Sequence, residues 1–165
     1  MLDFITSKIA MMIAAIIILT SALGIYALQR EQTKDLKLNN IADKIAGAIE
    51  NINTLQGETK VNITFDKGKE GIYIDPTVNG KNYEILISQY KIMITQEERR
   101  AISNFVIQIH LWLPLSNAYN LTEIEDIDES NRTLEFLSGE DFKIQRKLVE
   151  INGENEYRTF VYMEK

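Results

Sequence analysis

The chain opens with a long apolar segment. No charged residue stands between Lys8 and Arg30, and residues 9–28 read IAMMIAAIIILTSALGIYAL. A helix of about 20 residues, rising about 1.5 Å per residue, is long enough to cross a hydrocarbon core of about 30 Å. The core helix of a soluble protein would carry a polar stripe, and this segment is apolar all round. We therefore predict a single membrane-spanning helix over residues 9–28.

Two features of this segment leave alternatives open. Thr20-Ser21-Ala22 resembles the cleavage site of a secretory signal, but the apolar run is long for a signal and continues to Leu28. Small residues would let a neighbouring helix approach closely, although lipid also tolerates them. The positions that we assign to packing in the membrane or in a helix bundle are Ala10, Ala14, Ala15, Ile17, Ser21 and Gly24.

Beyond Arg30 the chain becomes polar but keeps a helical period. Apolar residues recur at steps of three and four, at Leu38, Ile41, Ile45, Ala48 or Ile49, Ile52 and Leu55. Proline is absent from this run, and Gly57 is a suitable helix stop. We predict one long helix over residues 1–57, whose second half, about residues 36–55, is amphipathic and needs an apolar surface to cover it. A separate juxtamembrane helix after a bend near Gly24 is the alternative.

After Lys60 the apolar period changes to two, which is typical of strands with one buried face. The expected strands lie at residues 61–65, 72–75, 83–87, 92–94, 105–111, 142–151 and 157–164. Asn152-Gly153 predicts a terminal hairpin, and the polar, acidic segment 116–130 is expected to be a loop. Short turns between successive strands indicate an antiparallel sheet. The expected fold is therefore α+β, with the long N-terminal helix packed on an antiparallel β-sheet domain over residues 58–165.

Composition excludes several classes of function. The formal net charge is −6 and no block of lysines or arginines is present, so nucleic acid is not an expected partner. Cysteine is absent and histidine occurs once, which excludes disulfides, thiolate zinc sites and metal sites with several histidines.

Individual residues give little sign of catalysis. Gly68 and Gly71 lack the helix and the Lys-Ser/Thr pair of a phosphate loop. We interpret His110 as a satisfied or exposed strand residue, because no partner for it is visible. The acidic run 123–129 lacks the glycine and closing glutamate of an EF-hand, so a solvated loop is favoured over a calcium site. Residues 112–115, WLPL, are expected to be strand-end core rather than a contact patch. We expect no enzyme activity, cofactor, metal or small-molecule substrate.

Two signals in the sequence point to opposite sides of the membrane for the domain. More basic residues follow the span than precede it, which by itself would place the domain in the cytoplasm. Three Asn-X-Thr sequons, at Asn62, Asn120 and Asn131, favour an outer surface that is open to N-glycosylation.

A long N-terminal helix, half apolar and half packed on an antiparallel sheet, resembles the type IV pilin fold. Residues 40–52, NIADKIAGAIENI, and 74–87, IDPTVNGKNYEILI, are similar to a pattern in archaeal pilin-like proteins, where an IAxAI helix end precedes a P-x-x-x-G-x-x-Y-x-I-x-I hairpin. The resemblance covers about the first 95 residues. Pilin precursors carry a short basic leader, and bacterial pilins often have a glutamate near the start of the mature helix. Here no leader precedes the apolar run and position 5 is Ile5, so we expect a chain that is already mature or is not processed.

The resemblance implies a structural subunit, major or minor, of an archaeal type IV pilus-like surface filament or of a related secretion pseudopilus. The apolar helix would leave the bilayer and pack against copies of itself or other pilins, and the β-domain would form the outer shell. The chain would lie in the cell membrane as a single-pass protein with its domain outside, or in an extracellular filament, with a role in cell adhesion. The alternative is a membrane-anchored extracellular binding or accessory module, similar to archaellum accessory proteins that engage the surface layer.

Overall fold

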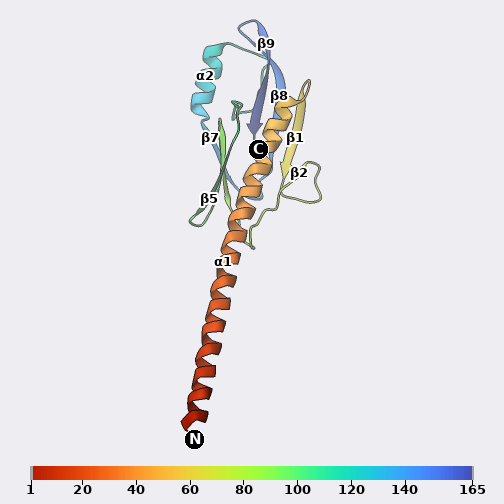
Figure 1. Cartoon of the computed structure of the whole chain (residues 1–165). Helices are drawn as coiled ribbons and strands as arrows, with labels where there is room; N and C mark the ends of the chain where they lie inside the picture. Colours follow the sequence, from red (N-terminus) through yellow and green to blue (C-terminus); the bar gives the residue numbers. More distant parts are fainter. Residues whose placement is uncertain (1, 165) are drawn as a thin grey trace. The chain divides into compact units, whose positions relative to one another are not determined.

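Helix α1 occupies the first third of the chain. The computed structural model describes residues 2–164, and α1 runs through Leu2–Thr54 without interruption (Figure 1). The predicted single long helix is confirmed, since no break occurs at Gly24. Gly57 follows the helix end with a φ of 87°, the left-handed conformation that is common after a helix. The residues of α1 fall in two compact units, Met1–Leu36 and Lys37–Lys165.

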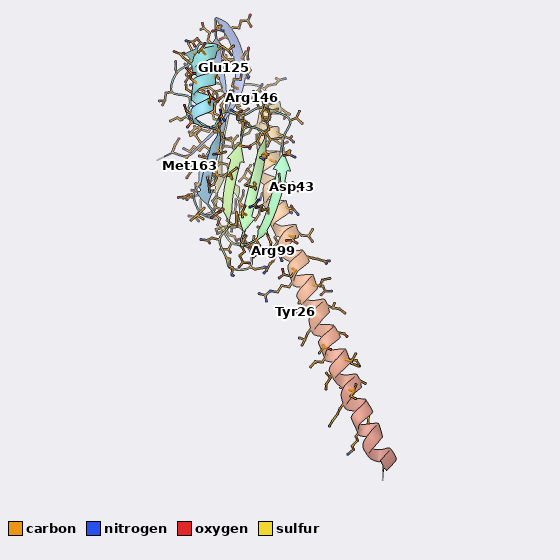
Figure 2. The ribbon with its side chains drawn as sticks, turned by 90° about the vertical axis from the view of Figure 1, so that its left-hand side faces the viewer. Tyr26, Asp43, Arg99, Glu125, Arg146 and Met163 are labelled. Carbon is orange, nitrogen blue, oxygen red and sulfur yellow. The ribbon has the colours of Figure 1, made fainter. Side chains whose placement is uncertain are left out.

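The part of α1 in the second unit is amphipathic, as predicted. Its apolar stripe is buried, with Leu38 1% exposed and both Ile45 and Ile49 0% exposed. Asp43 lies on the solvent side, and Figure 2 shows this part of the helix beside the strands of a sheet. The stripe ends before Leu55, which follows the helix and is 46% exposed.

Nine strands and a second helix complete the second unit in the described part of the chain. They are β1 (Thr59–Thr64), β2 (Ile72–Tyr73), β3 (Glu84–Ser88), β4 (Lys91–Gln96), β5 (Arg99–Asn104), β6 (Ala118–Tyr119), α2 (Leu121–Ser130), β7 (Thr133–Leu137), β8 (Phe142–Ile151) and β9 (Glu154–Tyr162). One sheet has four antiparallel strands in the order β5-β4-β3-β7. The other is built on β8, which pairs with β9 along one edge and with β1 and β6 along the other. The fold class is α+β, as predicted, although the β1–β2 and β6–β8 pairs are parallel.

The β8–β9 hairpin is covered on both faces. Neighbouring side chains of a strand point to opposite faces, and the hairpin register has no bulge. Phe142 and Ile144 join the main core, which contains the stripe of α1 and residues of both sheets. Val149 and Ile151 point to the other face and join a second cluster. The other members of this second cluster are Trp112, Ile124, Phe160 and Tyr162. A sheet buried on both faces explains why so little of this strand alternates cleanly between buried and exposed positions.

The expected strand over residues 105–111 is wrong. The strand β5 ends at Asn104, just before this range. The segment that follows, residues 105–112, crosses between the two sheets and is called the crossing segment below. The backbone nitrogen of Phe105 donates to the Tyr90 oxygen at 3.0 Å, and that of His110 donates to Thr159 of β9 at 2.9 Å. The apolar alternation reflects real burial, because Phe105, Ile109 and Leu111 all lie in the core. It did not correspond to a ladder, because successive residues bond to different sheets.

The expected loop over residues 116–130 is also wrong, because it contains α2. Asn120 caps this helix: its side chain accepts from the Glu123 nitrogen at 2.7 Å, and the Glu123 carboxylate accepts from the Asn120 nitrogen at 2.9 Å. This is a capping box, a reciprocal pair that starts a helix. The N-x-x-E signal was present in the sequence and was hidden by the acidic composition of the segment.

Candidate functional site

The apolar half of α1 is the most unusual surface among the described residues. All its described side chains from Met11 to Leu28 are exposed, including Met12 at 67% and Ile18 at 69%. Soluble monomers rarely expose continuous apolar patches of this size, which mark contact with other proteins or with a membrane. The helix is long and apolar enough to cross a membrane.

Polar groups in this segment are suited to an apolar environment. The Thr20 hydroxyl donates to the backbone oxygens of Ile16 at 2.9 Å and Ile17 at 3.0 Å. Its donor is therefore satisfied within the helix and does not need water as a partner. Tyr26 lies near the carboxyl end of the segment (Figure 2), four residues before the first following charge at Arg30. Tyrosine is enriched where a span meets the headgroups. Contact with lipid or with other apolar helices would therefore suit every described side chain of this segment.

The helix separates the predicted packing residues into two sets. At about 100° per residue, positions separated by three, four or seven residues share a face. Ala14, Ile17, Ser21 and Gly24 therefore lie along one face of the helix. Ala15 is turned about 100° away from Ala14 and lies on a different face. The backbone of Ala10 belongs to the helix and continues the first set, but its side chain lies outside the described residues.

The three sequons differ in their surroundings. Asn62 is exposed on β1, but Thr64 of the same sequon is 1% exposed and its hydroxyl accepts a hydrogen bond from the Asp66 nitrogen. Asn120, the cap of α2, is exposed together with the other two residues of its sequon. Asn131 is half-buried, and its amide nitrogen donates to the Ile127 oxygen at 2.8 Å. The structure does not bring these three asparagines together into one site.

A buried polar cluster joins α2 to the crossing segment. His110 Nδ1 lies 2.9 Å from both carboxylate oxygens of Asp128, and Trp112 Nε1 donates to Asp128 at 2.8 Å. The rings of His110 and Trp112 both pack on Phe160, with centroids 5.2 and 5.0 Å away. His110 Nε2 is buried without a hydrogen-bond partner. His110 is thus satisfied at Nδ1 by Asp128, as one of the two alternatives predicted, and it is buried, not exposed; it forms an isolated bridge with Phe160 and does not belong to one of the strands.

This cluster lies under an open cleft. The cleft has a volume of about 580 Å³, and Asp128 is part of its wall. Its other walls come from the β3–β4 turn, the crossing segment and the end of α2, through Ser88, Gln89, Tyr90, Gln108, Glu125, Glu129 and Arg132. Figure 2 shows Glu125 on α2. None of these residues was singled out by sequence reasoning as a cleft residue, since α2 was expected to be a loop.

The remaining sequence candidates have structural roles. Gly71 has a φ of 138°, and a β-carbon there would lie 2.4 Å from the Asn62 backbone oxygen, so this glycine serves strand packing. Trp112 and Pro114 are buried, as expected for core, but Leu113 and Leu115 are exposed. No group of three or more acidic or histidine side chains suited to a metal ion occurs among the described residues.

Comparisons with known proteins give no relative: no family model, no curated protein and no solved structure matches the chain. A long apolar helix whose carboxyl part packs on an antiparallel sheet is compatible with a pilin-like fold.

Proposed function

We propose that the chain is a structural subunit of an archaeal type IV pilus-like surface filament, inserted in the membrane before it assembles. The observation that carries this proposal is that one continuous helix has two halves that need different surroundings. Its amino-terminal half exposes ten aliphatic side chains between Met11 and Leu28, and its carboxyl-terminal half, from Leu38 on, is buried in a folded domain.

Water is an unfavourable environment for the exposed apolar half of α1. Fully burying an aliphatic side chain of this size stabilises by about 1.5–3 kcal/mol, so ten of them outweigh the about 5–15 kcal/mol that holds a typical domain folded. The segment therefore resides in lipid or against other apolar helices. A filament provides the second environment, and it explains the small residues Ala14, Ser21 and Gly24 on one face, which allow close helix approach.

The location of the chain tests the proposal directly. Intact cells are sheared, and the protein is followed by immunoblot in the sheared fraction and in the membrane pellet. We expect substantial recovery in the sheared fraction. Retention of all the protein in the membrane would contradict the filament role and support the second function below.

Two variants test the packing face. Ala14→Trp places a large side chain on the face of Ser21 and Gly24, and we expect membrane insertion without filaments. Leu19→Trp introduces the same residue where a large side chain already stands, and we expect filaments to form. Filaments of Ala14→Trp in wild-type amounts would exclude this face from the bundle.

A second function, favoured by the cleft beside α2, is a membrane-anchored extracellular binding module. It uses the apolar helix only as an anchor and places recognition in the domain. In that case both tryptophan variants insert and behave alike, and no sheared fraction contains the protein.

A further inference from the structure

The cleft beside α2 has the build of a ligand site. Three stretches that are distant in sequence form its walls: the β3–β4 turn with Tyr90, the crossing segment with Gln108, and the end of α2 with Glu125. Its volume is about 580 Å³, and it is open to solvent, so a ligand bound there would stay partly exposed.

The walls of the cleft are held in place. Asp128 is 7% exposed, and its carboxylate is bonded by His110 Nδ1 and Trp112 Nε1. Backbone bonds fix the opposite wall, because Tyr90 accepts from the Phe105 nitrogen at 3.0 Å and Gln89 accepts from Ile109 at 3.1 Å. These bonds fix the Asp128 carboxylate and the backbone of the opposite wall, so the frame of the cleft does not have to be ordered when a ligand binds.

The lining selects against most ligand classes. An anion would meet three carboxylates, and the single guanidinium, that of Arg132, already pairs with Glu129 at 2.5 Å. A cation would find only Glu125 without a hydrogen bond or ion pair, since Asp128 and Glu129 are engaged. An apolar ligand would leave the side-chain amides of Gln89 and Gln108 unpaired.

A neutral, hydroxyl-rich ligand fits what remains. The amides of Gln89 and Gln108 each offer donors and an acceptor, and Glu125 offers acceptors. These groups match the paired hydroxyls of a sugar. Tyr90 is 51% exposed at the same cleft, and its ring presents a flat apolar face with a polar tip. The apolar C–H face of a pyranose stacks on such a ring.

We propose that this cleft binds a neutral saccharide. The inference is independent of filament assembly, because all the residues that carry it belong to the second compact unit.

The test uses the full chain in detergent micelles. Saturation-transfer NMR and calorimetry are run with neutral oligosaccharides of glucose, mannose, galactose and N-acetylglucosamine as probes. We expect at least one probe to bind. Loss of the aromatic face in Tyr90→Ala should weaken that binding at least about tenfold, which corresponds to about 1.4 kcal/mol. Gln108→Ala should weaken it as well.

Matched variants keep the result interpretable. Tyr157→Ala removes a tyrosine of β9 that is 41% exposed and does not line the cleft, and we expect unchanged binding. Tyr90→Phe retains the ring and should bind within a few-fold of wild type. The proposal is overturned if no neutral probe binds, if Tyr90→Ala binds as wild type, or if sialylated or amino-sugar probes bind more tightly than neutral ones.

Discussion

His110 Nδ1 lies 2.9 Å from both carboxylate oxygens of Asp128, and both side chains are buried. The two residues lie 18 positions apart in the chain, one in the segment that crosses between the sheets and the other on α2. Trp112 Nε1 donates to the same carboxylate. Asp128 therefore joins α2 to the segment that crosses between the sheets.

Replacing Asp128 with alanine should destabilise the second unit by about 3 kcal/mol, because two buried donors would be left without a partner. Chemical denaturation of the full chain in detergent, followed by tryptophan fluorescence, measures this loss. Asp126→Ala, on the exposed side of the same helix, is the control and should change stability by less than about 0.5 kcal/mol. Equal effects of the two substitutions would contradict the role of Asp128.

The sequons should differ as acceptors of N-linked sugar in the folded chain. We expect Asn120 to be modified first, because its sequon is exposed and its cap bond to Glu123 uses the amide oxygen, not the nitrogen. Asn131 uses its nitrogen, and Asn62 belongs to a strand with a buried threonine.

A purified oligosaccharyltransferase with a lipid-linked oligosaccharide tests this order on folded and on denatured chain. Glycopeptide mass spectrometry should find sugar mainly at Asn120 in the folded chain and at all three sites after denaturation. Thr122→Ala removes the sequon and keeps the helix cap, so it should abolish the folded-state product without loss of stability. Equal occupancy of the three sites in the folded chain would show that local structure does not govern acceptance.

Stability should fall at acidic pH through Asp141. Partial burial tends to raise the pKa of this carboxyl, but hydrogen bonds from Lys69 Nζ, at 2.6 Å, and the Phe65 nitrogen outweigh burial and lower the pKa below its ordinary value. A depressed carboxyl pKa adds stability above the pKa of the unfolded chain, and this contribution is lost as the pH falls through the folded-state pKa.

Thermal melts at pH 6 and near pH 3 should show this difference. At pH 6, Asp141→Asn should melt below wild type, and the gap should narrow as the pH falls below the ordinary carboxyl pKa, because the unfolded wild-type chain then takes up a proton. Glu154→Gln alters an exposed carboxylate of the terminal hairpin and should run parallel to wild type. A gap that stays constant with pH would rule out titration of Asp141 as the cause.

Gly71→Ala should destabilise the fold by about 2 kcal/mol or more. Its φ of 138° is strained for alanine, and the added β-carbon would lie 2.4 Å from the Asn62 oxygen. The damage should centre on the parallel pairing of β2 with β1. Gly68→Ala is the matched control, because its nearest neighbour would be Asp66 Oδ1 at 3.4 Å. Hydrogen exchange at Ile74, whose nitrogen donates to Thr64, reports the local effect.

Local patterns foretold much of the fold. The three- and four-residue period from Leu38 to Ile52 marked a buried helix face, and the Asn152-Gly153 pair marked the hairpin of β8 and β9. Both signals come from the spacing and identity of residues within a few positions of one another, so they can be read from a short stretch of sequence. Residues 105–111 show the limit, because an alternation of buried residues says nothing about which backbone each residue bonds.

Of the two candidate sites, one could be recognised from the sequence and the other could not. The apolar half of α1 was recognisable from the sequence, because the need for a lipid-like environment follows from side-chain chemistry alone. The cleft was not, since its walls come from Tyr90, Gln108 and Glu125, which only folding brings together.

By itself, the sequence determined an apolar helical half followed by an amphipathic one, a β-rich remainder and the hairpin at Asn152-Gly153, because helical period and turn chemistry act over a few residues. Tertiary structure alone decided that β8 is buried on both faces, that β1–β2 and β6–β8 pair in parallel, and that His110 meets Asp128. Those relationships depend on which distant surfaces exclude water together, and that choice belongs to the whole folded unit.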